Sequence, residues 1–378
     1  MTLEERRPAT GPVVVYGATG YTGRLVAEEL LARGRSVVLS GRSAEKLAAL
    51  AARLGDGVEA VVPAALDDPA ALRDAAGRGA VLANCAGPFA WTGDAVLTAA
   101  TAAGAHYLDT TGEQDWMRRV FEHHDGALRA AGVAALPGMG FDYVPGDLLC
   151  HVVGRDLQPL RRITVAYDTQ DFGMTRGTMR SALEMVHGRD VAYEGGRWRT
   201  GGARPVREHV RFPAPIGRRL VARYPAGEIL TVPRHLQVRD VVARLTAVSI
   251  APRAVAPVVP AATPLLGRVL QGPLKGVLDR AIDRLPEGPP EDARRAVRWT
   301  IVAIAEGEDG QRAAGVVEGP DIYGLTAQTI AEGAERLADP GFTGAGALGP
   351  AAAFDAAEVL DALAPFGVRW RRDDALAA

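Results

Sequence analysis

Cysteine is nearly absent from this chain, which has two among its 378 residues. Cys85 and Cys150 lie far apart in apolar surroundings and match no metal-binding or redox spacing. We therefore expect no metal site, and we interpret both residues as small buried hydrophobic groups in a reducing compartment.

An excess of charge of one sign is also missing, because 43 basic residues balance 45 acidic ones. Net charge therefore gives no reason to expect nucleic acid or an anionic membrane as a partner. Long apolar runs are missing too: prolines interrupt the hydrophobic stretch 250–270, and the polar start MTLEERRPATG lacks the core of a signal peptide. These absences predict a soluble cytoplasmic protein without an integral membrane segment, long enough for two domains.

Three regularly spaced glycines follow an apolar run in the stretch VVVYGATGYTG at residues 13–23. The β-branched and aromatic run 13–16 predicts a buried strand, and the apolar spacing in 24–33 predicts an amphipathic helix. Gly17 suits the positive φ of a sharp turn, Gly20 allows a pyrophosphate to approach the backbone, and Gly23 lets the helix pack close to the strand. The pattern predicts a nucleotide-binding turn with the anion at the helix N-terminus.

A basic residue follows the second predicted strand, 36–40, where an NAD site usually has an acidic one. Arg42 can pair with a 2′-phosphate, and Ser43 can donate to the same phosphate while capping a helix that starts at Ala44. These two residues favour NADP(H) over NAD(H). The alternative is that Arg42 is an ordinary solvated surface arginine.

The rest of the first 145 residues alternates strands with helices, which predicts a doubly wound parallel sheet. The further strands are expected at 58–62, 80–85, 105–109 and 133–136, and the helices at 44–54, 69–76, 93–103 and 114–131. Asn84, Asp109 and Gly138 end three successive strands, so we expect them to converge on one crevice at the carboxyl edge. Asp67 either reaches an adenine amino group there or, with Asp68, caps the helix that begins at Pro69.

Beyond residue 145 the pattern changes to alternating polar and apolar residues, which favours an antiparallel sheet. Its strands are expected at 161–166, 197–200, 208–212, 220–223 and 238–248, with a final hairpin formed by 295–306 and 312–318. Helices are expected at 177–186, within 254–285, and at 323–337 and 356–363, with a Gly- and Pro-rich bridge at 339–350 and a charged tail at 369–374.

Five motifs together resemble the saccharopine-dehydrogenase-like oxidoreductases, in the branch that includes actinobacterial trans-acting enoyl reductases. They are GATGYTG at 17–23, GRSAEKL at 41–47, NCAGPF at 84–89, YLDTTGE at 107–113 and PGMGFDYVPGDL at 137–148. The resemblance implies an NADP-binding Rossmann domain at 1–145, a substrate domain on an antiparallel sheet at 146–320, and C-terminal helices at 321–378 that pack back on the Rossmann domain.

The resemblance also assigns cofactor contacts. It implies that the pyrophosphate is held by Gly17, Thr19, Gly20, Tyr21, Thr22 and Gly23, the 2′-phosphate by Arg42 and Ser43, and the nicotinamide side by Asn84, Ala86, Gly87 and Pro88. One departure is that relatives usually have a serine where this chain has Tyr143, and often a serine in place of Gly146.

Hydride transfer also needs a proton donor or a group that stabilises the remaining charge. Our first candidate is Tyr143, on a glycine-rich loop, although its hydroxyl can equally be bonded to a backbone carbonyl. Asp142 is a second candidate, or else the cap of a helix starting near Pro145. Further candidates are Glu113, Tyr107, Tyr167, Glu228 and His235.

Together these observations predict an NADPH-dependent reductase of a conjugated C=C bond in a lipid or secondary-metabolite intermediate. The substrate is expected to be a small molecule or to be bound to an acyl carrier, and a homodimer is one option for the assembly. Reduction of a C=N bond, as the saccharopine name suggests, is an alternative. A third interpretation is a scaffold or sensor protein that binds NADPH without turnover.

Overall fold

The computed structural model describes residues 11–170, 172–187, 191–201, 208–250, 256, 281–282 and 284–377. The chain forms two compact units, which are interleaved in sequence. Unit 1 comprises 1–111, 116–141 and 323–348, and unit 2 comprises 112–115, 142–322 and 349–378. The expected third segment, 321–378, therefore divides: its first helix belongs to unit 1, but residues after 348 belong to unit 2.

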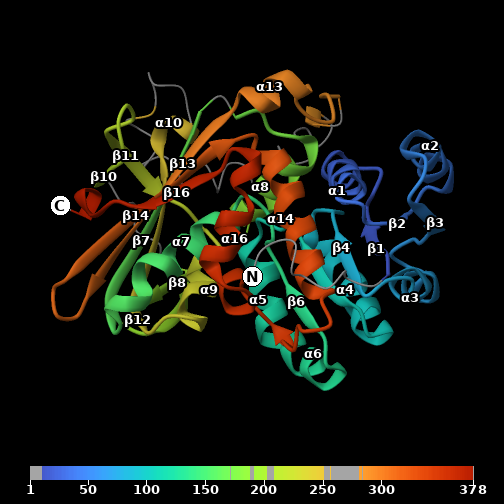
Figure 1. The fold of residues 1–378 in the computed structure, drawn as a ribbon, viewed down its shortest axis with the longest axis horizontal. Coiled ribbons are helices and arrows are strands. Elements are labelled where there is room, and N and C mark those ends of the chain that lie inside the picture. The colour runs from blue at the N-terminus through green and yellow to red at the C-terminus, as the bar shows by residue number, and fades with distance from the viewer. Residues whose placement is uncertain are drawn as a thin grey trace. The chain divides into compact units, whose positions relative to one another are not determined.

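Unit 1 is built on a parallel sheet of seven strands in the order β15-β6-β5-β4-β1-β2-β3 (Figure 1). The strands are β1 (Val13–Tyr16), β2 (Val37–Gly41), β3 (Val58–Pro63), β4 (Val81–Asn84), β5 (His106–Asp109), β6 (Ala134–Leu136) and β15 (Gly346–Ala347). The interior strand β1 is fully buried. The strand order reverses direction between β1 and β4, which places a topological switch point there.

The helices of this half follow the expected alternation. They are α1 (Tyr21–Ala32), α2 (Ala44–Leu54), α3 (Pro69–Ala76), α4 (Phe89–Ala103), α5 (Gln114–Arg119) and α6 (Asp125–Ala131), followed much later by α14 (Ile322–Leu337). The single helix predicted for 114–131 is interrupted, because Val120–His124 forms a π-helical turn between α5 and α6.

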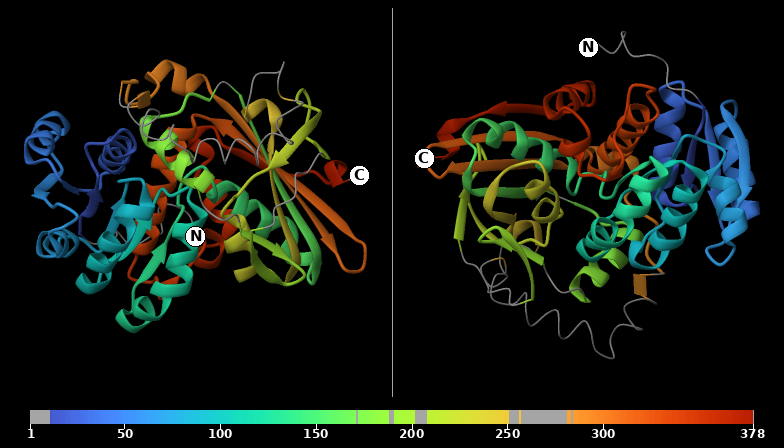
Figure 2. Two further views of the ribbon diagram at one scale, coloured as in Figure 1. Left: turned by 180° about the vertical axis from the view of Figure 1, so that it is seen from behind. Right: turned by 90° about the horizontal axis from the view of Figure 1, so that it is seen from below.

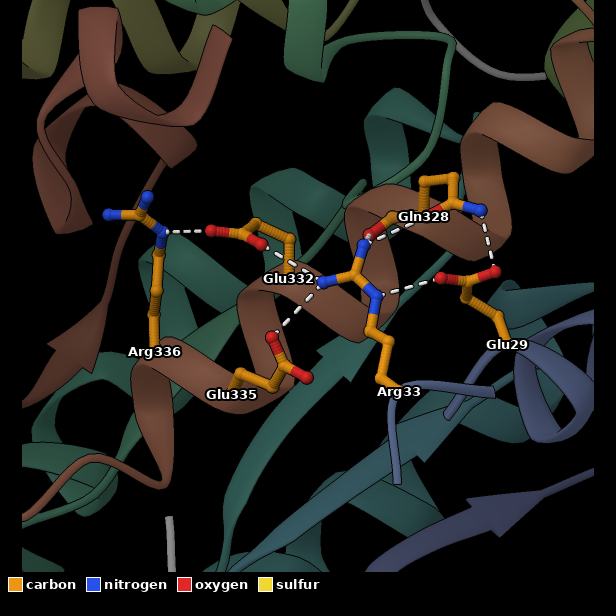
Figure 3. A network of polar contacts seen from close by, with 6 residues as sticks. All are labelled: Glu29, Arg33, Gln328, Glu332, Glu335 and Arg336. Atoms are coloured by element: carbon orange, nitrogen blue, oxygen red, sulfur yellow. Dashed lines mark hydrogen bonds and ion pairs between the residues drawn. The ribbon is translucent and has the colours of Figure 1, made fainter. Parts of the chain in front are cut away.

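A network of charged side chains fixes α14 against α1 (Figure 3). The Arg33 guanidinium contacts Glu29 at 2.7 Å, Glu332 at 3.0 Å and Glu335 at 3.1 Å, and it donates to the Gln328 amide oxygen at 2.8 Å. Glu332 is also paired with Arg336 at 2.7 Å, and Glu29 accepts from the Gln328 amide at 2.6 Å, so the partly buried carboxylates are compensated by a shared network with Arg33 at its centre. Arg33 and Glu335 are 302 positions apart, so the network explains how α14, from near the end of the chain, completes unit 1.

Unit 2 contains a nine-stranded sheet whose long strands lie side by side in Figure 1 and in both views of Figure 2. The strands are β7 (Leu160–Gln170), β8 (Val191–Glu194), β9 (Arg197–Thr200), β10 (Glu208–Arg211), β11 (Arg218–Arg223), β12 (Val238–Thr246), β13 (Arg298–Gly307), β14 (Arg312–Pro320) and β16 (Arg369–Arg372). The main path runs β10-β11-β12-β7-β13-β14-β16, and β8 pairs with β12 and β9. The expected antiparallel pattern holds for every pair but one, since β7 and β12 are parallel.

Helices of unit 2 cover this sheet. They are α7 (Val144–Gly154), α8 (Arg176–His187), α9 (Glu228–Thr231), α10 (Ala247–Ile250), α13 (Glu291–Ala296), α15 (Pro350–Ala353) and α16 (Ala356–Ala362). Short 3-10 turns lie at Arg155–Leu157, Val232–Arg234, Ala364–Phe366 and Asp374–Ala377. Most of the helices predicted within 254–285 lie outside the described residues. Helix α7 is buried along almost its whole length, so each polar residue on it needs a partner inside the fold.

Candidate functional site

The turn between β1 and α1 has the geometry that its glycines predict. Gly17 has a φ of +77°, and a Cβ there would lie 2.8 Å from the Cβ of Ala86. A Cβ on Gly23 would overlap the carbonyl oxygen of Gly17, so glycine is needed where the helix meets the turn. Gly20 is the N-cap of α1, no side chain caps this helix start, and its first turn has no acidic residue. The helix N-terminus is therefore suited to an anion.

Arg42 lies at the carboxyl end of β2 and is exposed. Burial raises the pKa of the Tyr16 phenol, and the Arg42 guanidinium partly offsets that rise, which indicates that its charge lies near the end of β1. Ser43 is the N-cap of α2 and accepts from the backbone N–H of Lys46 at 3.4 Å, so the capping role is as expected. An exposed guanidinium near the turn fits the predicted 2′-phosphate contact, which stays a prediction.

The two aspartates after β3 have different surroundings. The Asp68 side chain accepts from the N–H groups of Ala70 and Ala71, at 3.1 and 3.0 Å, and caps α3. Asp67 is exposed and does not cap this helix, so the capping alternative holds for Asp68 alone. The contact of Asp67 with adenine stays a prediction.

The ends of β4, β5 and β6 converge on the buried carboxylate of Asp109. Its Oδ1 accepts from the backbone N–H of Gly138 at 2.8 Å, and its Oδ2 accepts from the Tyr107 hydroxyl at 2.9 Å. Tyr107 in turn accepts from the Asn84 amide at 3.1 Å, and Asn84 Oδ1 accepts from the N–H of Ala86 at 3.0 Å. The predicted convergence of the three strand ends is therefore seen within unit 1.

This network changes the expected role of Asn84. The side chain is fully buried, and both ends of its amide are bonded to protein groups. Asn84 therefore shapes the loop that begins at Ala86, and a direct contact of its side chain with the nicotinamide would require these bonds to break. Burial raises the pKa of Asp109 to about 6, although four hydrogen bonds, the strongest from the Trp116 indole, act to lower it.

The predicted proton donors of unit 2 lie where α7 begins. Tyr143 is fully buried, and its hydroxyl donates to the backbone carbonyl of Gly112, as the alternative interpretation holds. Asp142 does not cap α7, whose N-cap is Tyr143 without a side-chain bond. Burial raises the pKa of the Asp142 carboxyl to about 6, and the nearby Tyr224 hydroxyl acts to lower it. Glu113 is buried and accepts from the Ser181 hydroxyl at 2.9 Å.

Two of the further candidates also form a buried pair here. The hydroxyl of Tyr167 contacts Oε1 of Glu228, which is completely buried. Burial raises the pKa of Glu228 well above its usual range. Tyr224 was not among the sequence candidates; its ring packs edge-on against that of Tyr167, with the ring centroids 5.5 Å apart, and burial raises the pKa of its phenol well above the usual value.

His235 takes part in a separate cluster on α7. Its Nε2 lies 2.9 Å from Oδ1 of Asp147, which also accepts from the Thr231 hydroxyl at 2.5 Å, and its Nδ1 lies 3.1 Å from Nδ1 of His151. Burial alone would raise the pKa of Asp147, but His235 and the hydrogen bonds bring it below its usual value. Every polar atom of Asp147 is bonded, since Oδ2 accepts from the N–H of Ala351. We interpret this cluster as a structural anchor of α7.

Two findings concern sites of other kinds. Within the described ranges, no helix combines the length and the apolar sequence needed to cross a bilayer. The same ranges contain no group of three or more His, Cys, Asp and Glu side chains placed to bind a metal ion.

The strand order of unit 1, its switch point and its glycine turn define a Rossmann domain that binds a dinucleotide. Residues 13–136 match the family model described as saccharopine dehydrogenase NADP binding domain. The predicted resemblance is confirmed by this match, and the cofactor of the domain is NADP(H).

Several curated relatives share this part of the chain. A trans-acting enoyl reductase of Mycobacterium leprae is 34% identical over 140 residues, which are 36% of this chain and 34% of the relative. One of Mycobacterium bovis is 30% identical over 198 residues, which are 51% of this chain and 46% of the relative. A lipid droplet localized protein of Caenorhabditis elegans is 34% identical over 146 residues, 36% of this chain and 34% of the relative. The chain thus spans less than half the length of these curated relatives.

One solved structure resembles the whole chain. It is the apo form of a saccharopine dehydrogenase (L-Glu forming) from Saccharomyces cerevisiae, with a TM-score of 0.60, and the match covers 96% of this chain and 100% of the other. The identity is 13%, so this likeness concerns the fold. It confirms the expected combination of a Rossmann domain with a second domain built on a largely antiparallel sheet.

Proposed function

We propose that the protein is an NADPH-dependent oxidoreductase that reduces a conjugated C=C bond in a lipid or secondary-metabolite intermediate. The observation that carries the proposal is the start of α1, uncapped by any side chain beside the Gly17 turn, in a domain that matches an NADP-binding family. The enoyl reductase names of the mycobacterial relatives support the reaction type. Cytoplasmic location, homodimer assembly and an acyl-carrier-bound substrate are finer parts of the same proposal.

The residues of unit 1 have distinct tasks in this proposal. Backbone N–H groups of the turn 17–23 bind the pyrophosphate, together with the side chains that the resemblance assigns there. Arg42 and Ser43 bind the 2′-phosphate, and the loop from Ala86 to Pro88 borders the nicotinamide. When bound, the cofactor supplies a hydride, and the protein must supply orientation and a proton.

The proposal is tested by single-turnover oxidation of NADPH bound to the purified protein. Enoyl thioesters, imines and ketones are mixed with the complex, each thioester both as a free coenzyme A ester and on an acyl carrier protein. We expect oxidation with an enoyl thioester and formation of the saturated product. Oxidation by imines alone would replace the proposal with C=N reduction, and no oxidation by any acceptor would favour the non-catalytic alternative.

A control uses the same protein with the cofactor turn blocked. In Gly17→Val, the added side chain meets Ala86 and requires a positive φ that valine strongly disfavours. This variant should bind NADPH weakly and should show no oxidation. Oxidation at the wild-type rate would indicate a contaminating reductase.

A further inference from the structure

A series of buried hydrogen bonds in unit 1 runs from Asp109 to the loop that follows β4, and we call it the Asp109 chain. Its members are Asp109, Tyr107, Asn84 and the backbone N–H of Ala86. The three side chains are fully buried. They lie on one face of the sheet, because Tyr107 and Asp109 are two positions apart on β5 and Asn84 is the partner of Asp109 on β4. The Asp109 chain therefore links the end of β5 to the loop after β4.

Each bond of the Asp109 chain has only one possible direction. The Asp109 carboxylate accepts, so the Tyr107 hydroxyl gives its single proton to Oδ2 at 2.9 Å. The Tyr107 oxygen can then only accept, and it takes an N–H of the Asn84 amide at 3.1 Å. This leaves the Asn84 oxygen for the N–H of Ala86 at 3.0 Å. The orientation of the Asn84 amide, and with it the position of Ala86, therefore depends on Asp109.

The carboxylate at the start of the Asp109 chain is held in a fixed place. Its Oδ1 accepts from the backbone N–H groups of Thr111 at 3.0 Å and Gly138 at 2.8 Å, and its Oδ2 also accepts from the Trp116 indole at 2.6 Å. Together with Tyr107, these four donors satisfy both oxygens of a buried carboxylate in its charged form. Asp109 can therefore act as a rigid acceptor for the rest of the chain.

A second hydrogen bond holds the same loop from the side of α4. The Thr92 hydroxyl donates to the carbonyl of Ala86 at 2.5 Å, so both backbone groups of Ala86 are bonded inside unit 1. The next N–H, that of Gly87, is exposed and has no hydrogen-bond partner among the described residues. The loop therefore presents an available backbone donor directly after a residue whose own backbone is fixed.

This loop lies against the turn that is suited to the pyrophosphate. The N–H of Cys85 donates to the carbonyl of Tyr16 at 2.8 Å, and a Cβ on Gly17 would lie 2.9 Å from the nitrogen of Ala86. In an open parallel sheet, ligands bind at the carboxyl ends of the strands beside the switch point, which here are β1 and β4. Because Arg42 follows β2, the 2′-phosphate is expected on the β2 side, and the nicotinamide half is then expected on the β4 side.

We propose that Asp109 and Tyr107 are positioning residues for the nicotinamide half of NADP(H). They act through Asn84 on the loop from Ala86 to Pro88, and this rests on the cofactor placement of the proposed function. The Asp109 chain keeps the Gly87 N–H in a fixed place, where it can donate to an oxygen of the nicotinamide half. A donor that is already in place strengthens binding, because no loop has to be ordered when the cofactor binds. The effect of the buried side chains should therefore appear only in the affinity for ligands that carry the nicotinamide half.

The main test compares the Kd of NADPH with that of 2′,5′-ADP, a fragment that carries the adenosine and the 2′-phosphate but no nicotinamide. Tyr107→Phe removes the hydroxyl that links Asp109 to Asn84 and keeps the ring. We expect the Kd of NADPH to rise about 10-fold, the effect of one hydrogen bond, and the Kd of 2′,5′-ADP to stay within about twofold of wild type. Isothermal titration calorimetry measures both values on the purified protein.

Tyr16→Phe is the matched control for this variant. Tyr16 is also a buried tyrosine of unit 1, and its hydroxyl donates to the carbonyl of Ala64 at 3.2 Å, outside the Asp109 chain. The control therefore loses one buried hydrogen bond of the same kind. The ratio of its two Kd values should stay as in wild type, because the loop after β4 keeps its bonds.

Two further variants test the same proposal by other routes. Asp109→Asn keeps one oxygen for the backbone N–H groups but replaces the acceptor of the Tyr107 hydroxyl by an amide, which breaks the direction of the chain. Thr92→Val releases the Ala86 carbonyl and leaves the chain intact. Both should show the selective loss of NADPH affinity. Thr101→Val, which removes a hydroxyl bonded within α4, should show none.

These outcomes are independent of the reductase test, because no substrate is present. Equal weakening of NADPH and 2′,5′-ADP in Tyr107→Phe and Asp109→Asn would show that the Asp109 chain only supports the fold, and the proposal would be wrong. Unchanged affinity for both ligands in these variants would also contradict it. If single turnover finds no acceptor but the selective loss is seen, the reductase proposal fails and the positioning role stands.

Discussion

At the scale of single residues, we expect one side chain after β2, that of Arg42, to decide which nicotinamide coenzyme the protein prefers. Arg42 is exposed where a 2′-phosphate is expected, and within the described residues it forms no hydrogen bond or ion pair. Binding of a phosphate by this guanidinium would therefore not require any internal hydrogen bond or ion pair to break, which keeps the free-energy cost of binding low.

We therefore expect Arg42→Ala to weaken NADPH binding about 10- to 100-fold, since hydrogen bonds to charged groups contribute about 1.5–3 kcal/mol. NADH binding should stay within about twofold of wild type, because NADH lacks the 2′-phosphate. Fluorescence titration with both coenzymes measures the two Kd values. Arg53→Ala, which removes another exposed arginine from the same helical region, is the control. Equal weakening of NADPH and NADH binding would contradict the assignment of Arg42.

The same scale shows which site residues a sequence can predict. The glycine turn, Arg42 and the convergence of Asn84, Asp109 and Gly138 follow from local order, because parallel strands end at one edge. The contact of Tyr167 with Glu228 does not follow, since it depends on how β7 and the start of α9 lie in the folded unit. The sequence left Asp142 as either a cap or a site residue; the fold excludes the cap, and its role in the site stays a prediction.

At the scale of secondary-structure elements, long periodic segments were predicted well and edge strands were not. The helices α2 and α3 have the predicted bounds, and the hairpin β13–β14 differs from prediction by a few residues. The strand β15 has only two residues in a glycine-rich bridge, and β16 is RWRR, so neither has an alternating apolar pattern. Both are held by pairing with β6 and β14, which is long-range information. The parallel pairing of β7 with β12 is missing from the prediction for the same reason.

The contact between α1 and α14 leads to a prediction about elements. Arg33→Ala should lower the free energy of unfolding by about 3 kcal/mol, because Glu29 and Glu335 lose their ion pairs and Glu332 keeps only its pair with Arg336. The side chain of Arg33 is 15% exposed and that of Glu332 is 2% exposed. Arg53→Ala breaks a pair with Glu28 whose members are 56% and 47% exposed, and it should cost less than about 1 kcal/mol.

Urea unfolding of both variants measures these costs, and hydrogen exchange of α14 shows where they act. We expect faster exchange in α14 for Arg33→Ala and unchanged exchange for Arg53→Ala. A loss of stability in Arg33→Ala no larger than in Arg53→Ala would mean that apolar packing, and not the network of Figure 3, holds α14 in place.

At the scale of the whole molecule, each unit contains a carboxyl group whose pKa is raised by burial to about 6. In unit 1 it is Asp109, and in unit 2 it is Asp142. Burial also raises the pKa of Glu228 in unit 2. Natural folds retain such groups at a cost in stability, and each aspartate lies among polar side chains of its own unit. The cost should be visible as a dependence of stability on pH.

We predict that these carboxyls make the protein less stable as pH rises from 4 to 7. A carboxyl with a pKa of 3.8 when unfolded and about 6 when folded binds its proton more tightly in the folded state. Its contribution is therefore fully present below pH 3.8 and is lost as pH rises through 6, by up to about 3 kcal/mol for each such group. The lowered pKa values of His106 and His151 act in the opposite direction, so a comparison with variants is needed.

The comparison uses the difference in unfolding free energy between wild type and Asp142→Asn, measured with urea at several pH values from 4 to 7. This difference should fall by up to about 3 kcal/mol as pH rises, because the variant lacks the titrating group. Asp67→Asn removes one exposed carboxyl and serves as the control for the change in net charge. A difference that stays constant across this range would show that Asp142 has the same pKa in the folded and unfolded states.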